Sequence, residues 1–517
     1  MNQLPSAAPN PWMIALAVML PTFMEVLDTT IANVSLGHIA GSLSVSTDQS
    51  TWVLTSYLIA NAIIIPCSSW ISQRFGRKSF LLACVTVFTA ASFLCGLATS
   101  LPMLLAMRVI QGAGGGAFQP IAQTIMLESF PKERQGMAMG VYGLGVVIAP
   151  IVGPVLGGWI TDSYSWRWIF FIKVPAGVLA LLLIQRFIHD PAWIRDAKPG
   201  RLDFIGLGFM ALWLGCQEVL LDKGQEEDWF GSRFIVAMAV LAVLGLVVFI
   251  VRGLRSAKPF VDLRILGRYN FGLGAVLMFA AGITLYAMTA IIPLFLQSLL
   301  GYTALQSGYA MIPRGLGALL CMPLAGRLVA IVPGRYLVTG GFLCFGLSSF
   351  ALTQVSPDLT SWTVFWPLFF SGASIAFLFV PLNTLALGGL RPEQLGNASG
   401  IFNLMRNVGG SVGIALVTTL VARGSQTHQA TLVSHLTPYD GAYTAQVQTL
   451  TSAFATQGDP IAAQQQAVGT LYHGMVAQAH LLAYLDIFSR FVLLSMICIA
   501  IALCLAKNTA RGPVAAH

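Results

Sequence analysis

Residues 12–37 read "WMIALAVMLPTFMEVLDTTIANVSLG", and this stretch indicates a helix that crosses a membrane. It exceeds the roughly 20 mostly apolar residues that a spanning helix needs. Glu25 and Asp28 interrupt it, three residues apart and therefore on one side of the helix. Ionisable side chains inside a membrane cost about 2.5–3.5 kcal/mol each, so these two acids are candidates for function.

The composition of the whole chain agrees with this first stretch. Of 517 residues, 56% are hydrophobic and only 9% are charged, whereas soluble domains carry about 25% charged residues. The sequence therefore predicts an all-α polytopic membrane protein. Its fourteen candidate spans are 12–35, 51–71, 79–99, 101–127, 136–160, 166–188, 203–222, 234–251, 271–299, 305–328, 336–354, 362–387, 397–422 and 485–506.

The distribution of charge predicts an orientation and excludes a nucleic-acid partner. The formal net charge is +8, and most lysines and arginines fall in the predicted loops on one side. Cytoplasmic loops of membrane proteins carry this excess. Because the number of spans is even, both termini are expected in the cytoplasm. The first apolar run is too long for a signal peptide and lacks a cleavage site, so it is expected to act as an anchor.

Cysteine and histidine spacing points to neither disulfides nor a metal site. All eight cysteines fall inside predicted spans without a C-x-x-C pair, which is typical of small core residues. His473 and His480 are seven residues apart, which is not a metal-ligand spacing.

The predicted spans divide into groups of six, two and six. We expect an N-terminal bundle over 12–189, a linker over 190–269 with two extra spans (203–222 and 234–251), and a C-terminal bundle over 270–506. The two sixes resemble weak repeats around a central cavity, a design found in transporters. An outer loop over 423–484 is polar and nearly uncharged, and its last part has helical spacing after Asp459 and Pro460. It is either a solvated excursion or a docking element.

The fourth span carries a polar stripe that cannot face lipid. Arg108, Gln111, Gly115 and Gln119 lie within a narrow arc at 3.6 residues per turn. The stripe faces either a watery cavity or another polar helix. We expect Arg108 to lie near Asp28 and to bias its proton binding; the alternative is that Arg108 only joins two helices through an ion pair.

The fifth span has a smooth face for close helix contact. Gly145, Ala149, Gly153 and Gly157 recur every four residues, and the neighbouring Pro150 and Pro154 predict a kink. Close packing alone is sufficient to explain the glycines, but the prolines favour a hinge or seal. Among the other side chains within spans, Lys173 is expected to snorkel toward the outer surface, and Tyr57, Met288 and Phe377 are candidates for lining the cavity, although such residues also pack in apolar helices.

Taken together, the motifs resemble the major facilitator superfamily, and within it the fourteen-helix drug:proton antiporters of the EmrB/QacA type, closest to the EmrB branch. "LDTTIANV" is similar to the first-helix signature, "RVIQGAGGG" to the proton-coupling motif, and "GLGVVIAPIVGPVLGG" to the antiporter motif of helix five. The resemblance covers nearly the whole chain. It assigns proton coupling to Asp28 and Arg108, with Glu25 as an additional acid. It assigns the antiporter motif to Gly145, Pro150, Gly153, Pro154, Gly157 and Gly158. As polar side chains within spans, Gln111, Gln119 and Arg406 are further candidates for lining the cavity.

The chain departs from this family pattern at several positions. Ser69 and Gln73 stand where the cytoplasmic gating loop usually has a Gly and an Asp, although Arg74, Gly76, Arg77 and Lys78 remain. Lys173 stands where the family commonly has an Asn. A gating ion pair from the missing Asp is therefore not expected.

The resemblance implies the major facilitator fold, with two extra central helices, and a proton-driven multidrug efflux antiporter without a cofactor. The expected substrates are amphipathic, mostly cationic or lipophilic drugs; the alternative is a dedicated exporter of a metabolite, fatty acid or siderophore. It also implies the inner membrane of a bacterium, with a periplasmic adaptor and an outer-membrane channel as partners. An intramembrane enzyme is disfavoured because His38 and His189 lie at span ends without catalytic partners. A scaffold or sensor would have a cavity without proton-coupled flux.

Overall fold

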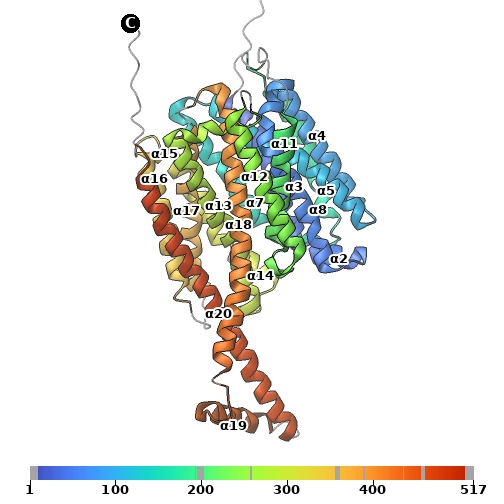
Figure 1. Ribbon diagram of the computed structural model, residues 1–517, viewed down its shortest axis with the longest axis vertical. Helices are drawn as coiled ribbons and strands as arrows, with labels where there is room; N and C mark the ends of the chain where they lie inside the picture. The colour runs from blue at the N-terminus through green and yellow to red at the C-terminus, as the bar shows by residue number, and fades with distance from the viewer. Residues whose placement is uncertain are drawn as a thin grey trace, which may run out of the picture.

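The computed structural model describes residues 10–191, 194, 203–256, 259–355, 361–387, 390–434, 436–455 and 460–506. Part of the predicted linker, residues 195–202, lies outside this range. The regular structure of the described residues is entirely helical (Figure 1).

The helices of the N-terminal part are α1 (Pro11–Val34), α2 (Leu36–Leu43), α3 (Thr47–Phe75), α4 (Arg77–Gly96), α5 (Leu101–Gly115), α6 (Phe118–Ser129), α7 (Gln135–Ser163), α8 (Trp168–Phe171) and α9 (Lys173–Phe187). They are followed by α11 (Phe204–Lys223) and α12 (Arg233–Arg255). The C-terminal part has α13 (Tyr269–Leu300), α14 (Ala304–Ala310), α15 (Ile312–Leu328), α16 (Gly334–Leu352), α17 (Ser361–Leu387), α18 (Pro392–Val433), α19 (Gly441–Ala455) and α20 (Pro460–Leu503). Short 3-10 turns cover Lys132–Arg134, Trp229–Gly231 and Leu263–Gly267.

Within the described residues, 12 helices are long and apolar enough to cross a membrane. The two other predicted spans are each divided into consecutive helices, α5 with α6 and α14 with α15. Pro120 and Pro313 explain the interruptions, because a proline has no N–H to bond the carbonyl four residues earlier. The count of fourteen spans stays a prediction, and the chain is a multi-pass membrane protein.

The two halves repeat one pattern of helix neighbours. In the first half α1 packs on α7 and α9, α3 on α5, and α4 on α5 and α9. In the second half α13 packs on α18 and α20, α15 on α17, and α16 on α17 and α20. This correspondence is that of two related bundles.

The halves meet along two reciprocal contacts. Helix α7 packs on α14, α15 and α17, while α18 packs on α3 and α6. Helix α11 lies in the crevice between α3 and α18, and α12 packs on α11 from outside. The extra helices therefore occupy one side of the contact between the halves.

The predicted outer loop is helical over most of its length. Helices α18 and α20 are 42 and 44 residues long, and they continue together beyond the ends of the other helices (Figure 1). Helix α19 lies at their far end and packs on α20 (Figure 1). We call residues 423–484 the outer hairpin.

Candidate functional site

The structure places Asp28 in a buried cluster with two cations. Its side chain is fully enclosed and forms ion pairs with Arg108 and Lys173. The Gln111 amide donates a third hydrogen bond to Asp28 Oδ1, at 3.0 Å. The predicted proximity of Arg108 to Asp28 is confirmed, and the polar stripe of the fourth span faces a polar helix, α1.

Arg108 is fixed by contacts beyond the ion pair. Its Nε donates to the carbonyl oxygen of Val53 at 2.8 Å, and Nη1 donates to Gln111 Oε1 at 2.9 Å. The guanidinium carbon also lies 4.2 Å from the centre of the Tyr57 ring, a cation–π distance. Arg108 is therefore a permanent, positioned counter-ion of Asp28.

The expectation that Lys173 snorkels to the outer surface is wrong. Lys173 is only 2% exposed, and its ammonium group contacts Asp28 and lies 4.8 Å from the Phe170 ring. Because Lys173 is the first residue of α9, which packs on α1, its side chain meets the Asp28 carboxylate. Pairing with the Asp28 carboxylate offsets part of the cost of removing the lysine charge from water.

Glu25 has different surroundings from Asp28, although it lies three residues away. It accepts hydrogen bonds from Asn61 Nδ2 at 3.1 Å and from Gln119 Nε2 at 2.6 Å. Both donors are neutral amides, and Glu25 is 5% exposed. Among the described residues, no cation is in direct contact with Glu25, so no ion pair compensates its negative charge.

Gln119 connects Glu25 to the second half of the molecule. Its Oε1 accepts a hydrogen bond from Arg406 Nη2 of α18, while its Nε2 donates to Glu25 of α1. One turn further along α6, Gln123 Oε1 accepts hydrogen bonds from Asn403 Nδ2 at 2.7 Å and Ser399 Oγ at 2.8 Å. A buried polar network thus joins the acid of the first half to an arginine of the second.

Four members of this network were not predicted as site residues: Asn61, Gln123, Ser399 and Asn403. Each is a buried polar side chain within an apolar helix, a feature that indicates an internal partner because an unsatisfied amide or hydroxyl is costly there. That signal was present in the sequence, but it does not identify the partner.

The glycine-rich face of α7 packs against α1. A Cβ at Gly157 would lie 2.8 Å from Ile31 Cγ1, and one at Gly153 would collide with Thr30. Gly145 and Gly158 have more space, with Met19 at 3.5 Å and Val34 at 4.0 Å. Helix α7 runs through Pro150 and Pro154 as one helix.

The loop predicted to gate the cytoplasmic side has one ion pair and one backbone hydrogen bond to a carboxylate. Arg77 is buried and pairs with Glu128 of α6, with 2.7 Å between Nη1 and Oε2. The Lys78 backbone N–H donates to Asp190 Oδ1 at 2.8 Å. Gly76 has φ +87°, a conformation that suits glycine, and a Cβ there would lie 2.8 Å from Asp190. Arg74 is exposed.

The residues expected to line a cavity are enclosed by protein in this structure. Tyr57 and Met288 have no exposed surface, and Arg406 is 1% exposed. Phe377 packs at the edge of the same apolar core as Tyr57. The structure therefore has the two halves closed around these side chains.

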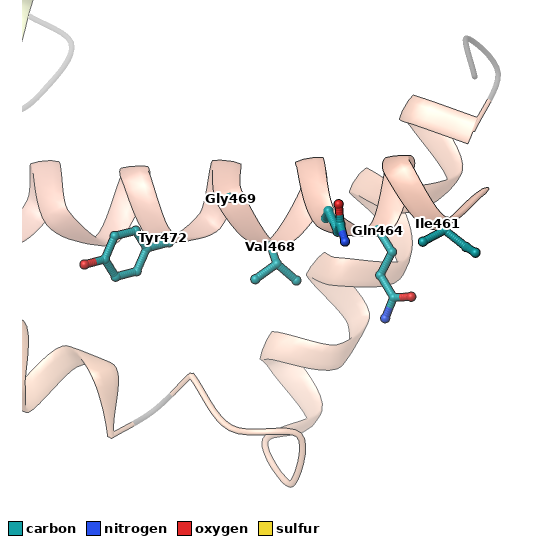
Figure 2. A pocket seen from close by; sticks show the side chains of 6 residues that line it. Ile461, Gln464, Val468, Gly469 and Tyr472 are labelled. Atoms are coloured by element: carbon teal, nitrogen blue, oxygen red, sulfur yellow. The ribbon is translucent and has the colours of Figure 1, made fainter. Parts of the chain in front are cut away.

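One face of α20 in the outer hairpin borders an open, shallow space of about 580 Å³. Figure 2 shows its side chains, which follow one another along the helix. The lining residues are Ile461, Gln464, Gln465, Val468, Gly469 and Tyr472. Among the described residues there is no group of three or more His, Cys, Asp or Glu side chains that could hold a metal ion.

Comparison with known proteins identifies the family. The profile of the Major Facilitator Superfamily matches residues 18–414. The chain belongs to the major facilitator superfamily. It is 38% identical to the multidrug export protein EmrB of Haemophilus influenzae, over 83% of this chain and 84% of the relative. It is 36% identical to the fatty acid resistance protein FarB of Neisseria gonorrhoeae, over 82% and 84%.

The fold of this superfamily member matches solved structures as well. A double tryptophan mutant of XylE has a TM-score of 0.62 at 14% identity, covering 96% of this chain and 97% of that one. The family and fold make this chain a secondary transporter rather than an enzyme, and they support the prediction of an EmrB-type antiporter from the sequence motifs.

Proposed function

We propose that this chain is a proton-driven multidrug exporter of amphipathic compounds, mainly cationic or lipophilic ones. The observation that carries the proposal is Glu25, a buried acid held by neutral amides and connected through Gln119 to the second half. No cofactor is needed, because the proton gradient supplies the energy. The relationship to the multidrug export protein EmrB supports the same function.

Asp28, Glu25 and Arg108 form the coupling site in this proposal, with different roles. Two cations in contact with Asp28 stabilise its negative charge, so that carboxylate has less tendency to take a proton. Glu25 has no cation in contact and is the better acceptor. A proton on Glu25 removes a buried charge, whereas an ionised Glu25 attracts a cationic substrate.

Competition between a proton and a cationic substrate for Glu25 would produce antiport. A cation and a proton cannot both occupy Glu25, so substrate binding from the cytoplasm releases a proton and proton binding from outside releases the substrate. Alternation between the two sides then follows from differential binding to the two facings of the transporter. Helices one, two, four and five of each half would surround the pathway.

Proton release on substrate binding tests the proposal. Tetraphenylphosphonium, a cation without a proton of its own, is added to the purified, detergent-solubilised protein and the released protons are counted. We expect release from wild type, a strong loss in Glu25→Gln, and retained release in Asp28→Asn that folds. Release that survives Glu25→Gln but disappears in Asp28→Asn would assign exchange to Asp28, and no release from wild type would contradict proton antiport.

Export of anionic amphiphiles is the second candidate, and Arg406 favours it. Its Nε and Nη1 make no hydrogen bond with a described residue although the side chain is buried. The buried side chains within the spans include the acids Glu25 and Asp28 but the bases Arg108, Lys173, Arg314 and Arg406. The relationship to the fatty acid resistance protein FarB agrees with such a dedicated exporter.

The two candidate functions predict opposite proton movements, which are release when a cation binds and uptake when an anion binds. An anion on Arg406 competes with the charge of Glu25 and therefore favours proton uptake. Adding laurate, a fatty-acid anion, to the same sample should cause uptake if the second candidate holds, and no change if Arg406 serves only to join the halves.

We further propose that the protein resides in the inner membrane of a bacterium, with both termini cytoplasmic. The outer hairpin then projects into the periplasm, where a periplasmic adaptor leading to an outer-membrane channel would bind it. The length of the hairpin and the open space along α20 support this arrangement (Figures 1 and 2).

A further inference from the structure

The buried cluster around Asp28 has an excess positive charge. Its charged members are one carboxylate, Asp28, and two bases, Arg108 and Lys173. All three side chains are at most 2% exposed. A net charge held away from water is costly unless it is paired, so this cluster has a reason to lose one proton.

The two bases differ in how firmly their charge is held. Arg108 donates to Val53, Gln111 and Asp28 and stacks on Tyr57, and a guanidinium stays protonated in proteins. Lys173 makes one hydrogen bond with a described residue, to Asp28, and faces the Phe170 ring. A lysine amine gives up its proton more readily than arginine when it is buried.

No other charged side chain faces Lys173 from the helices packed on α9. These helices are α1, α4 and α8. Residues 79–96 of α4 and the whole of α8 contain no acidic or basic side chain, although Cys84 and Cys95 lie in α4. Besides Asp28, α1 contributes only Glu25, which bonds to Asn61 and Gln119. Loss of a proton from Lys173 therefore leaves the Arg108–Asp28 pair balanced.

We propose that Lys173 is a second proton-exchanging group of the transporter, which carries its proton on the amine while Asp28 stays ionised. The proton leaves the ammonium for water when a cationic substrate enters beside the cluster, because like charges repel. Glu25 and Lys173 then release two protons for one monovalent cation. The inference rests on the proposed function, which it deepens by naming the second proton carrier.

Replacement of Lys173 by arginine separates this role from a structural one. Arginine keeps the ion pair with Asp28 but cannot release its proton. We expect Lys173→Arg to fold, to bind tetraphenylphosphonium and to release one proton fewer per bound cation than wild type. Lys173→Gln should show the same loss, and the double variant with Glu25→Gln should release none. Equal proton counts in wild type and Lys173→Arg would overturn the inference.

Lys223→Arg is the matched control. Lys223 is also a buried lysine in an ion pair, with Glu226 at 2.7 Å, but it lies at the end of α11 and its ammonium group bonds Glu226 and Thr51 rather than Asp28. Its replacement should leave the proton count unchanged. A decrease equal to that of Lys173→Arg would mean that the count does not report Lys173 and would overturn the assignment.

A substrate-free titration distinguishes failure of the inference from failure of antiport. Between about pH 5 and 9, below the usual lysine pKa of about 10.4, wild type should bind one more exchangeable proton than Lys173→Arg. This difference requires no transported substrate. If it is present while tetraphenylphosphonium releases no protons, Lys173 titrates and the proposed antiport is wrong; if it is absent, the inference is wrong.

Discussion

The Asp28 carboxylate is enclosed by Arg108, Lys173 and the Gln111 amide. Its negative charge therefore stabilises the two buried cations. Asn at this position removes the negative charge and leaves Arg108 and Lys173 buried side by side. Removing one partner of a buried ion pair typically destabilises by about 3–5 kcal/mol, because the other charge is left uncompensated.

We predict that Asp28→Asn lowers stability by about 3–5 kcal/mol and that Lys173→Gln in the same chain restores part of the loss. The restoration follows because the double variant leaves only Arg108 without its carboxylate partner, whereas Asp28→Asn alone leaves both Arg108 and Lys173 without it. Unfolding of the purified protein in detergent measures both effects. Simple addition of the two single losses would contradict a direct pairing of Asp28 with Lys173.

Arg77 provides a second residue-level prediction, at the end predicted to be cytoplasmic. Its buried pair with Glu128 joins the start of α4 to α6. Arg77→Gln leaves the largely buried Glu128 without its cation, so we expect a several-fold loss of transport in proteoliposomes. The exposed Arg74 is the control, since Arg74→Gln removes a neighbouring charge without breaking this pair and should transport like wild type.

The residues of the site were easier to predict from the sequence than the residues that they contact. Arg108 was expected beside Asp28 because a polar stripe needs a polar neighbour, and the structure agrees. Lys173 was misplaced because its distance from the span end indicated snorkelling, and only the packing of α9 on α1 reveals the carboxylate within its reach. Contacts between distant helices are not encoded in a local pattern.

Among the helices, the contact of α1 with α7 depends on the space available at individual glycines. A Cβ at Gly157 would lie 2.8 Å from Ile31 Cγ1 and 3.0 Å from the Ile31 carbonyl oxygen, whereas one at Gly158 would be 4.0 Å from Val34. An added methyl group should therefore disturb the contact with α1 at Gly157 but not at Gly158.

We predict that Gly157→Ala destabilises by about 1–3 kcal/mol, the usual effect of overpacking, and reduces transport. Gly158→Ala should have little effect on either. Thermal unfolding in detergent and transport in proteoliposomes measure the two properties. Equal losses in both variants would show that helix flexibility, rather than the contact with Ile31, is the reason for the glycines.

Helix α19 contributes little to the membrane body. None of its residues is buried, and it packs on α20. We predict that a short glycine-serine linker in place of residues 436–459 leaves proton-coupled transport in proteoliposomes unchanged. The same variant should lose drug resistance in cells if the hairpin binds a periplasmic partner. Loss of transport in proteoliposomes would instead show that the hairpin stabilises the transporter itself.

For the whole molecule, the halves are in contact near both of the predicted membrane ends. A Cβ at Gly396 would be 3.3 Å from Ser69 Cβ at the end predicted to be cytoplasmic, and one at Gly308 would be 3.9 Å from Val155 Cβ at the end predicted to be outer. Disulfides join Cβ atoms that are about 3.5–4.5 Å apart, so the second pair lies within this range and the first is slightly closer. Cysteine pairs at these positions therefore probe whether each end must open.

We predict that oxidising either the Ser69→Cys/Gly396→Cys pair or the Val155→Cys/Gly308→Cys pair stops transport, and that reduction restores it. The eight native cysteines are first replaced by serine, so that only the introduced pair reacts. Each single cysteine variant serves as the control under the same oxidant. Transport that continues through a formed cross-link would contradict alternating access at that end.

The architecture was largely predictable because hydrophobic length and repeated helix spacing are strong signals. The divided spans were harder, since Pro120 and Pro313 interrupt segments whose composition is continuous. For the outer loop over 423–484 the sequence predicts helical spacing only in the last part, after Asp459 and Pro460. The structure extends α18 and α20 into this segment and adds α19 between them.

Because α18 continues from the membrane body into the outer hairpin, a tilt of this helix would move the far end of the hairpin. From Arg406 to Val433, α18 is one uninterrupted helix, roughly 40 Å long at 1.5 Å per residue. If α18 tilts by about 10° as the halves rock, a rigid arm of that length moves its far end by about 7 Å. A protein bound to the tip would then be pushed once in every transport cycle, and a proton bound at Glu25 would be coupled to a displacement at the tip.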